Sequence, residues 1–133
     1  MKIELAKNEL IHFVGIGGIG MSGLALIMKG MGFKIQGSDI SYNKNVERLK
    51  KNKIKVNLGH RKKNINKATL LVISSAITKN NPEILEAKKK ELPIYKRGQM
   101  LAHITSLTKN IVVTGSHGKT TTTSLIAAIF SKA

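Results

Sequence analysis

The chain has 133 residues, a length that fits one domain, or one domain with part of a second. Its apolar share of 41% supports a core, and the core is aliphatic because the chain has two Tyr, three Phe and no Trp. Zero cysteine excludes disulfides and thiolate metal sites. The sequence has no recognisable signal peptide and no apolar run near the ~18 residues of a membrane span, so we expect a soluble, cytoplasmic protein.

The formal net charge of +16 is typical of proteins that bind nucleic acids. The lysines are scattered, however, with clusters only at 50–51, 61–63 and 88–90, and no aromatic residues are interleaved with them. A phosphorylated small molecule explains the charge equally well. We therefore expect neither a nucleic acid nor a membrane as partner. The alternative, a basic nucleic-acid-associated protein, predicts steeply salt-dependent binding to DNA or RNA.

A glycine-rich segment follows the first apolar run, and apolar residues then recur at helical spacing. Gly15, Gly17 and Gly20 match the pattern G-x-G-x-x-G, which provides a tight turn, a backbone that approaches a pyrophosphate, and a close contact between helix and strand. Amide groups at the start of such a helix face an anion. The segment therefore predicts a strand, a phosphate-binding loop and a helix.

Strands alternate with helices along the rest of the first hundred residues. The expected strands cover residues 11–14, 33–37, 54–58, 70–73 and 93–95, and helices are expected from Met21, at 46–50, from Pro82 to Lys90 and from Arg97 to about Ile104. Asn81 before Pro82 has the form of an N-cap. This alternation is typical of an α/β fold with a Rossmann-like, doubly wound parallel sheet.

Polar residues gather where the ligand of such a sheet binds, at the carboxyl ends of the strands. Asp39 lies nineteen positions beyond Gly20, where these folds meet a ribose hydroxyl, and His60 and the Ser74–Ser75 pair also end strands. The structural alternatives are a turn cap for Asp39, a plain turn residue for His60 and a tight strand end for the serines. We assign His12 and His103 to packing or to the surface.

A second glycine loop follows a β-branched run at 111–114, which predicts a strand. The segment from Gly115 to Thr121 reads GSHGKTT, and a helix is expected from there through Phe130. In such a loop, backbone amides surround a phosphate chain, Lys119 contacts the β and γ phosphates, and the Thr120 hydroxyl binds Mg²⁺. The loop is shorter than the common P-loop, because valine stands at position 113 in place of glycine. We place a domain boundary between residues 108 and 109.

The whole chain resembles the Mur ligase family. The resemblance rests on motifs in the family's order: VGIGGIGMSG, QGSD, LGH, SSAI with NPE, KRGQMLA and GSHGKTTTT. Among family members, the chain is most similar to those that join L-alanine to UDP-N-acetylmuramate in peptidoglycan synthesis. Members that reattach a recycled tripeptide share the layout, but they usually differ in the glycine loop and in the SSAI motif, and they are the second alternative.

The resemblance implies that residues 1–108 bind the UDP-sugar rather than NAD and that residues 109–133 begin the central ATP-binding domain. The implied UDP-sugar site comprises Gly15, Ile16, Gly17, Gly18, Ile19, Gly20, Met21, Ser22, Asp39, His60, Ser74, Ser75, Ala76 and Arg97. The implied ATP site comprises Gly115, Ser116, His117, Gly118, Lys119, Thr120 and Thr121, with Lys119 as the catalytic residue and Thr120 as the Mg²⁺ ligand.

In this family, ATP converts the muramyl carboxylate to an acyl phosphate, and the amine of L-alanine then displaces phosphate. Members of the family are several times longer than this chain, so the resemblance implies that the chain holds an incomplete central domain and is inactive alone. A binding module that holds a nucleotide sugar or a dinucleotide without chemistry is a further alternative.

Overall fold

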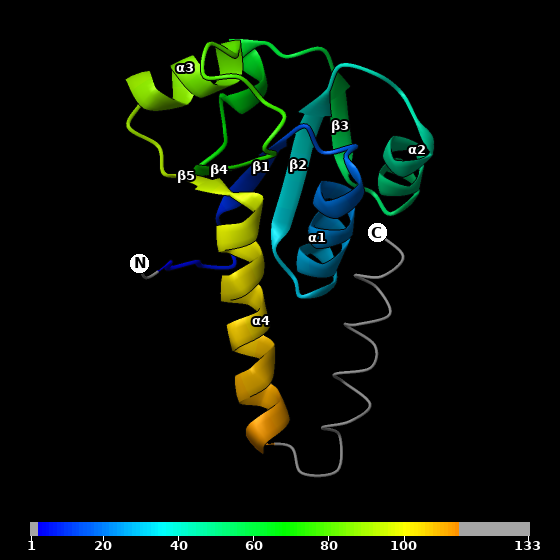
Figure 1. Ribbon diagram of the computed structural model, residues 1–133, viewed down its shortest axis with the longest axis vertical. Helices are drawn as coiled ribbons and strands as arrows, with labels where there is room; N and C mark the ends of the chain where they lie inside the picture. Colours follow the sequence, from blue (N-terminus) through cyan, green and yellow to red (C-terminus); the bar gives the residue numbers. More distant parts are fainter. Residues whose placement is uncertain (1–2, 115–133) are drawn as a thin grey trace.

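The computed structural model describes the backbone of residues 3–114 and the side chains of residues 3–107. Within this range, the chain forms a five-stranded, fully parallel sheet with the strand order β3-β2-β1-β4-β5 (Figure 1). The strands are β1 (Leu10–Val14), β2 (Lys34–Asp39), β3 (Lys55–Leu58), β4 (Leu70–Ile73) and β5 (Ile94–Lys96). The helices are α1 (Ile19–Gly30), α2 (Lys44–Lys51), the 3-10 helix η1 (Lys62–Ile65), α3 (Pro82–Lys89) and α4 (Arg97–Thr114). The expected doubly wound α/β fold is confirmed.

Helices cover both faces of the sheet, and β1 shows how its residues divide between the faces. Ile11 and Phe13 are fully buried in the larger core, which α1, α2 and α4 share with one face of the sheet. Val14 belongs to the smaller core on the other face, together with residues of α3 and η1. His12 alternates with Ile11 and Phe13 and so lies on this second face. Figure 1 shows α3 across the sheet from α1.

The expected helices and strands up to β5 begin and end close to the observed positions. The strand β2 extends to Asp39, so this residue is the last of the strand instead of following it. The N-cap of α3 is confirmed, because Asn81 Oδ1 accepts a hydrogen bond from the backbone N–H of Glu83 at 2.9 Å. The helix α1 ends before Gly32, whose φ of +99° is the left-handed conformation expected after a helix.

The expected strand at 111–114 is wrong, because α4 continues without interruption to Thr114. A strand needs a neighbouring strand for its backbone hydrogen bonds, whereas a helix makes these bonds within its own segment. The sheet in the described residues ends at β3 and β5, and neither strand pairs with this segment. The expected boundary at residue 108 falls inside α4, and the expected loop and helix at 115–130 lie outside the described residues. None of the described helices is both long and apolar enough to cross a membrane.

Gly37 in β2 leaves the space that Ile16 of the glycine loop occupies. A Cβ atom at Gly37 would lie 2.5 Å from Ile16 Cδ1 and 2.7 Å from the carbonyl oxygen of Phe13. Phe13 is the register partner of Gly37 in β1, so its backbone cannot move without breaking the strand pairing. The absence of a side chain at Gly37 therefore fixes the path of the loop after β1.

We predict that Gly37→Ala lowers the free energy of unfolding by about 2 kcal/mol or more, because the added methyl group overpacks the contact between β1 and β2. The matched control is Gly30→Ala, where no atom lies within 4 Å of the added Cβ. This control should raise the free energy of unfolding by about 0.5 kcal/mol, as alanine favours a helix over glycine. Urea denaturation measures both, and a Gly37→Ala variant as stable as the wild type would contradict the packing argument.

Candidate functional site

The glycine loop follows β1 at the carboxyl edge of the sheet. At this point the sheet continues through β2 and β3 on one side of β1 and through β4 and β5 on the other, which is where ligands of such sheets bind. Gly15 adopts a φ of +83°, a left-handed conformation that favours glycine. A Cβ atom at Gly15 would lie 3.2 Å from Ile77 Cδ1 and 3.4 Å from Ser74 Cβ. The loop after β1 and the turn after β4 therefore face each other across this edge.

The peptide groups of Gly17 are hydrogen-bonded to the last residue of β2 and to the first turn of α2. Asp39 Oδ2 accepts a hydrogen bond from Gly17 N at 2.8 Å, and Asn45 Nδ2 donates one to Gly17 O at 3.0 Å. A Cβ atom at Gly17 would lie 2.8 Å from Asp39 Oδ2 and 2.9 Å from Val46 Cγ2. The G-x-G-x-x-G motif predicts that the backbone at Gly17 can approach a pyrophosphate, and in the structure the Gly17 N–H group donates to Asp39.

The first turn of α1 presents amide groups to this edge. Gly18 is the N-cap and has no side chain to bond them, and the first turn contains no acidic residue. The N–H groups of Ile19, Gly20 and Met21 belong to this turn, where a helix has no internal acceptors. These amides and the helix dipole together favour an anion.

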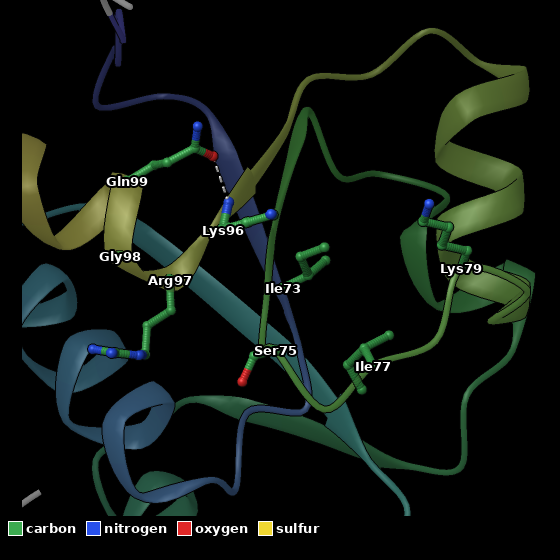
Figure 2. A pocket seen from close by; sticks show the side chains of 8 residues that line it. All are labelled: Ile73, Ser75, Ile77, Lys79, Lys96, Arg97, Gly98 and Gln99. Atoms are coloured by element: carbon green, nitrogen blue, oxygen red, sulfur yellow. Dashed lines mark hydrogen bonds between the residues drawn. The ribbon is translucent and has the colours of Figure 1, made fainter.

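A pocket of about 530 Å³ lies beside this helix start, at the carboxyl ends of β4 and β5 (Figure 2). Its walls include Ser75 and three cationic side chains, Lys79, Lys96 and Arg97. The Arg97 side chain extends toward α1, and its Cδ lies 3.0 Å from where a Cβ of Gly20 would be. Ser75 and Arg97 were expected at the substrate site, whereas Lys79 and Lys96 were not, because single lysines among 23 basic residues do not stand out in the sequence.

The turn after β4 is closed by Ser74, whose Oγ accepts a hydrogen bond from the backbone N–H of Ala76 at 3.0 Å. Ser75 is exposed, so its hydroxyl faces solvent at the rim of the pocket. Further along the edge, Ile40 and Leu58 are apolar but 77% and 46% exposed. Leu58 is the register partner of Asp39, which places an apolar surface next to this carboxylate.

A buried carboxylate lies behind this edge. Glu83 on α3 and His12 on β1 are both fully buried. Glu83 Oε1 accepts hydrogen bonds from His12 Nε2 and Ser38 Oγ, each at 2.6 Å. Its Oε2 accepts from Asn64 Nδ2 at 2.7 Å and from the backbone N–H of Arg61 at 3.0 Å. This one side chain links α3 to β1, to β2 and to the segment after β3.

Burial raises the pKa of Glu83, but the hydrogen bond and electrostatic attraction from His12 and the hydrogen bonds from Ser38 and Asn64 outweigh burial. Together they lower the pKa of Glu83 from 4.5 to about 2. The buried carboxylate is therefore ionised near neutral pH. Its negative charge is stabilised by donors, as a buried charge requires.

His60 and His12 both contact this carboxylate network. His60 Nδ1 lies 2.9 Å from Ser38 Oγ and 3.5 Å from Glu83 Oε2, and the His60 side chain is 11% exposed. On the other side, Gln36 Nε2 donates to His12 Nδ1 at 2.8 Å, so His12 is hydrogen-bonded through both ring nitrogens. His12 is buried, as expected for a packing residue, and both of its ring nitrogens make hydrogen bonds to polar side chains.

From the sequence, Glu83 is known only as the last residue of the NPE motif. A signal was present in the alternation of β1, where His12 is the polar residue on a face otherwise buried beneath α3. A buried imidazole needs hydrogen-bond partners. The partner itself could not be found locally, because Glu83 lies 71 residues further along the chain.

The family model described as "Mur ligase family, catalytic domain" matches residues 10–109. The match covers about three quarters of the chain and includes every element of the carboxyl edge. The chain belongs to the Mur ligase family. The resemblance seen in the motifs is thus confirmed, and the family's matched region coincides with the parallel sheet and its helices.

This Mur ligase chain is similar to UDP-N-acetylmuramate–L-alanine ligases of several bacteria. It is 78% identical over 132 residues to the UDP-N-acetylmuramate–L-alanine ligase of Pelagibacter ubique, and 54% identical over 127 residues to that of Aquifex aeolicus. These matches cover 99% and 96% of this chain but 28% of each relative. The chain therefore spans little more than a quarter of the length of these relatives.

Solved structures of the Mur ligase family have the same fold. UDP-N-acetylmuramate–alanine ligase from Thermotoga maritima superimposes with a TM-score of 0.67 at 35% identity, over 75% of this chain and 23% of that chain. UDP-N-acetylmuramate:L-alanyl-γ-D-glutamyl-meso-diaminopimelate ligase from Neisseria meningitides gives a TM-score of 0.66 at 30% identity, over 70% of this chain and 30% of that chain.

We predict that Glu83→Gln changes the acid stability of this Mur ligase chain. Because folding lowers the pKa of Glu83 from 4.5 to about 2, its stabilisation is complete above pH 4.5 and is lost as the pH falls toward 2. A shift of this size corresponds to a free energy on the order of 3 kcal/mol. The variant should lose about this much near neutral pH and should then respond less than the wild type to acid below pH 4.5.

Urea denaturation across this pH range measures the effect. Glu86→Gln is the matched control, because it removes the same charge from the same helix at a partly exposed ion pair, 3.7 Å from Lys90. The control should change the free energy of unfolding by less than about 0.5 kcal/mol. Parallel pH curves for the Glu83→Gln variant and the wild type would contradict the argument.

Proposed function

We propose that this protein is an ATP-dependent ligase that joins L-alanine to UDP-N-acetylmuramate in bacterial peptidoglycan synthesis. The observation that carries the proposal is the 78% identity to the ligase of that name from Pelagibacter ubique, over 99% of the chain. A cytoplasmic location follows from the proposal, since ATP is the energy source. Ligation of a recycled tripeptide is the alternative. The tripeptide ligase structure from Neisseria meningitides is 30% identical to this chain.

The carboxyl edge of the sheet binds the UDP-sugar in this proposal. The diphosphate lies against the loop from Gly15 to Ser22, where the amides of the first turn of α1 have no acidic neighbour on the helix. Arg97 supports this placement, because its side chain reaches the same helix start at Gly20. An arginine beside helix amides is a strong site for an anionic oxygen.

The uridine lies toward β2 and β3, and the sugar toward β4. Asp39 and His60 are the polar groups on the uridine side, and exposed Ile40 and Leu58 offer apolar surface to a flat base. On the sugar side, the turn from Ser74 to Ala76 leads into the cationic pocket. The muramyl carboxylate gives the substrate an anionic group that matches the positive charge of this pocket.

In this proposal, ATP and Mg²⁺ bind at the motif from Gly115 to Thr121, and residues 109–133 begin the ATP-binding domain. These residues lie outside the described part of the chain, so this step rests on the motif and the family. An oxygen of the muramyl carboxylate attacks the γ-phosphorus and ADP leaves; the alanine amine then attacks the acyl carbon and phosphate leaves. Lys119 would stabilise the charge on the transferred phosphoryl group, and Thr120 would hold the Mg²⁺ ion that supplies further positive charge there.

Isothermal titration of the 133-residue chain tests the binding step. We expect UDP-N-acetylmuramate to bind in preference to NAD, and we expect no phosphate release when ATP and L-alanine are added, because relatives are more than three times as long. Preferential binding of NAD would overturn the assignment of the substrate. Phosphate release that requires both L-alanine and the UDP-sugar would overturn the expectation that this chain alone is inactive.

We predict that Arg97→Ala weakens binding of UDP-N-acetylmuramate about tenfold or more, because it removes a charged donor to an anionic oxygen. Lys89→Ala is the matched control: it also removes one positive charge, from an exposed position on α3. The control should leave the affinity within about twofold, since an exposed charge away from the ligand is screened by salt. Equal losses in both variants would mean that overall charge, and not Arg97, attracts the substrate.

A further inference from the structure

The Ser38 hydroxyl stands between His60 and Glu83. Ser38 is fully buried on β2, and its Oγ lies 2.6 Å from Glu83 Oε1 and 2.9 Å from His60 Nδ1. A hydroxyl has one proton to donate and lone pairs to accept with. Ser38 can therefore be the donor in at most one of the two contacts.

The carboxylate determines the direction of both bonds. An ionised carboxylate only accepts hydrogen bonds, so Ser38 donates its one proton to Glu83. The Ser38 lone pair then accepts from His60, which requires a proton on His60 Nδ1. In a neutral imidazole this arrangement leaves Nε2 as a bare acceptor. No hydrogen bond to His60 Nε2 is found among the described residues.

The same carboxylate also holds the backbone around His60. Its Oε2 accepts from the N–H of Arg61 and from the side chain of Asn64, and Asn64 Nδ2 also donates to the carbonyl oxygen of Gly59 at 3.0 Å. Gly59 adopts a φ of +92°, and its N–H donates to the Asp39 carbonyl oxygen at 2.7 Å. Both chain neighbours of His60, Gly59 and Arg61, are therefore fixed by hydrogen bonds, and Gly59 is bonded to Asp39.

We propose that Glu83, acting through Ser38, is a positioning residue that holds His60 in the Nδ1–H tautomer and makes His60 Nε2 an acceptor for an N–H or O–H group of the nucleotide sugar. The identity of this ligand rests on the proposed function. Glu83 itself lies behind the sheet edge and is fully buried, so it acts on the ligand only through His60.

The tautomer is tested in the 15N-histidine-labelled chain by two-bond 1H–15N correlation spectra, which distinguish a protonated from a bare ring nitrogen. We expect His60 of the wild type to show Nδ1–H and a bare Nε2. In Glu83→Gln, Ser38 no longer faces a carboxylate and becomes free to donate toward His60, so the Nε2–H form should appear. Ser38→Ala is the second variant, for the case that Glu83→Gln does not fold, and it should also lose the pure Nδ1–H pattern.

A purely structural role for Glu83 would lower stability without changing the His60 tautomer. An unchanged Nδ1–H pattern in whichever of these variants fold would overturn the proposal. The control Glu86→Gln, on the same helix, should leave the pattern as in the wild type. A wild-type spectrum that shows His60 with Nε2–H would also overturn it.

Binding of UDP-N-acetylmuramate tests the function of the positioned nitrogen. We expect His60→Ala to weaken binding about tenfold, which is the effect of one lost hydrogen bond of ordinary strength. Ser38→Ala should weaken binding about threefold or more, and the double variant should bind no more weakly than His60→Ala, because Ser38 acts through His60. Additive losses would overturn the coupling.

The two proposals fail in different ways. If the wild type does not bind UDP-N-acetylmuramate, the proposed function fails, while the tautomer spectra still decide whether Glu83 positions His60. If the wild type binds the UDP-sugar but the spectra of the folded variants match the wild type, the proposed function stands and the positioning role is wrong.

Discussion

The carboxylate of Glu83 is fully buried and accepts four hydrogen bonds, from His12, Ser38, Asn64 and the backbone of Arg61. These donors come from β1, β2 and the segment after β3, so one ionised side chain of α3 connects the second face of the sheet to its carboxyl edge. A buried charge with this many donors is stable only when every donor is in place. The network therefore ties the packing of α3 to the position of the residues that meet the ligand.

The proposed anion site is formed by elements that pack on the opposite face of the sheet. The loop from Gly15 to Gly20 passes over Gly37, which has no side chain, and leads into a helix start that is not capped by any side chain. Arg97 extends from α4 to the same helix start, and two lysines line the pocket beside it. Three cationic side chains, Lys79, Lys96 and Arg97, thus line one pocket, although the sequence scatters its basic residues. This geometry supports the proposal of a phosphorylated ligand.

Local patterns in the sequence predict most of this fold, because buried parallel strands and amphipathic helices have strong periodicity. The N-cap at Asn81 and the glycine loop were also predictable, because each is specified by a few neighbouring residues. The strand expected at 111–114 was wrong, because β-branched residues favour a strand only where another strand pairs with them. The Glu83 network was not predictable, since His12 and Glu83 are 71 residues apart and meet only when the sheet forms. The contacts of Asp39 and Val46 with Gly17 were also not predictable, because these residues lie more than twenty positions along the chain and reach the glycine loop only in the folded sheet.

The most direct test of the central claim, that the carboxyl edge of this sheet is a nucleotide-sugar site, is a 1H–15N NMR titration of the chain with UDP-N-acetylmuramate. The claim predicts that the largest amide shifts cluster in the glycine loop from Gly15 to Ser22, next to Asp39 and His60, in the turn at 74–76 and at the start of α4. The amides of η1 and of the C-terminal half of α3 should move little. Shifts concentrated on those surfaces, or the same pattern with NAD as with the UDP-sugar, would contradict the claim.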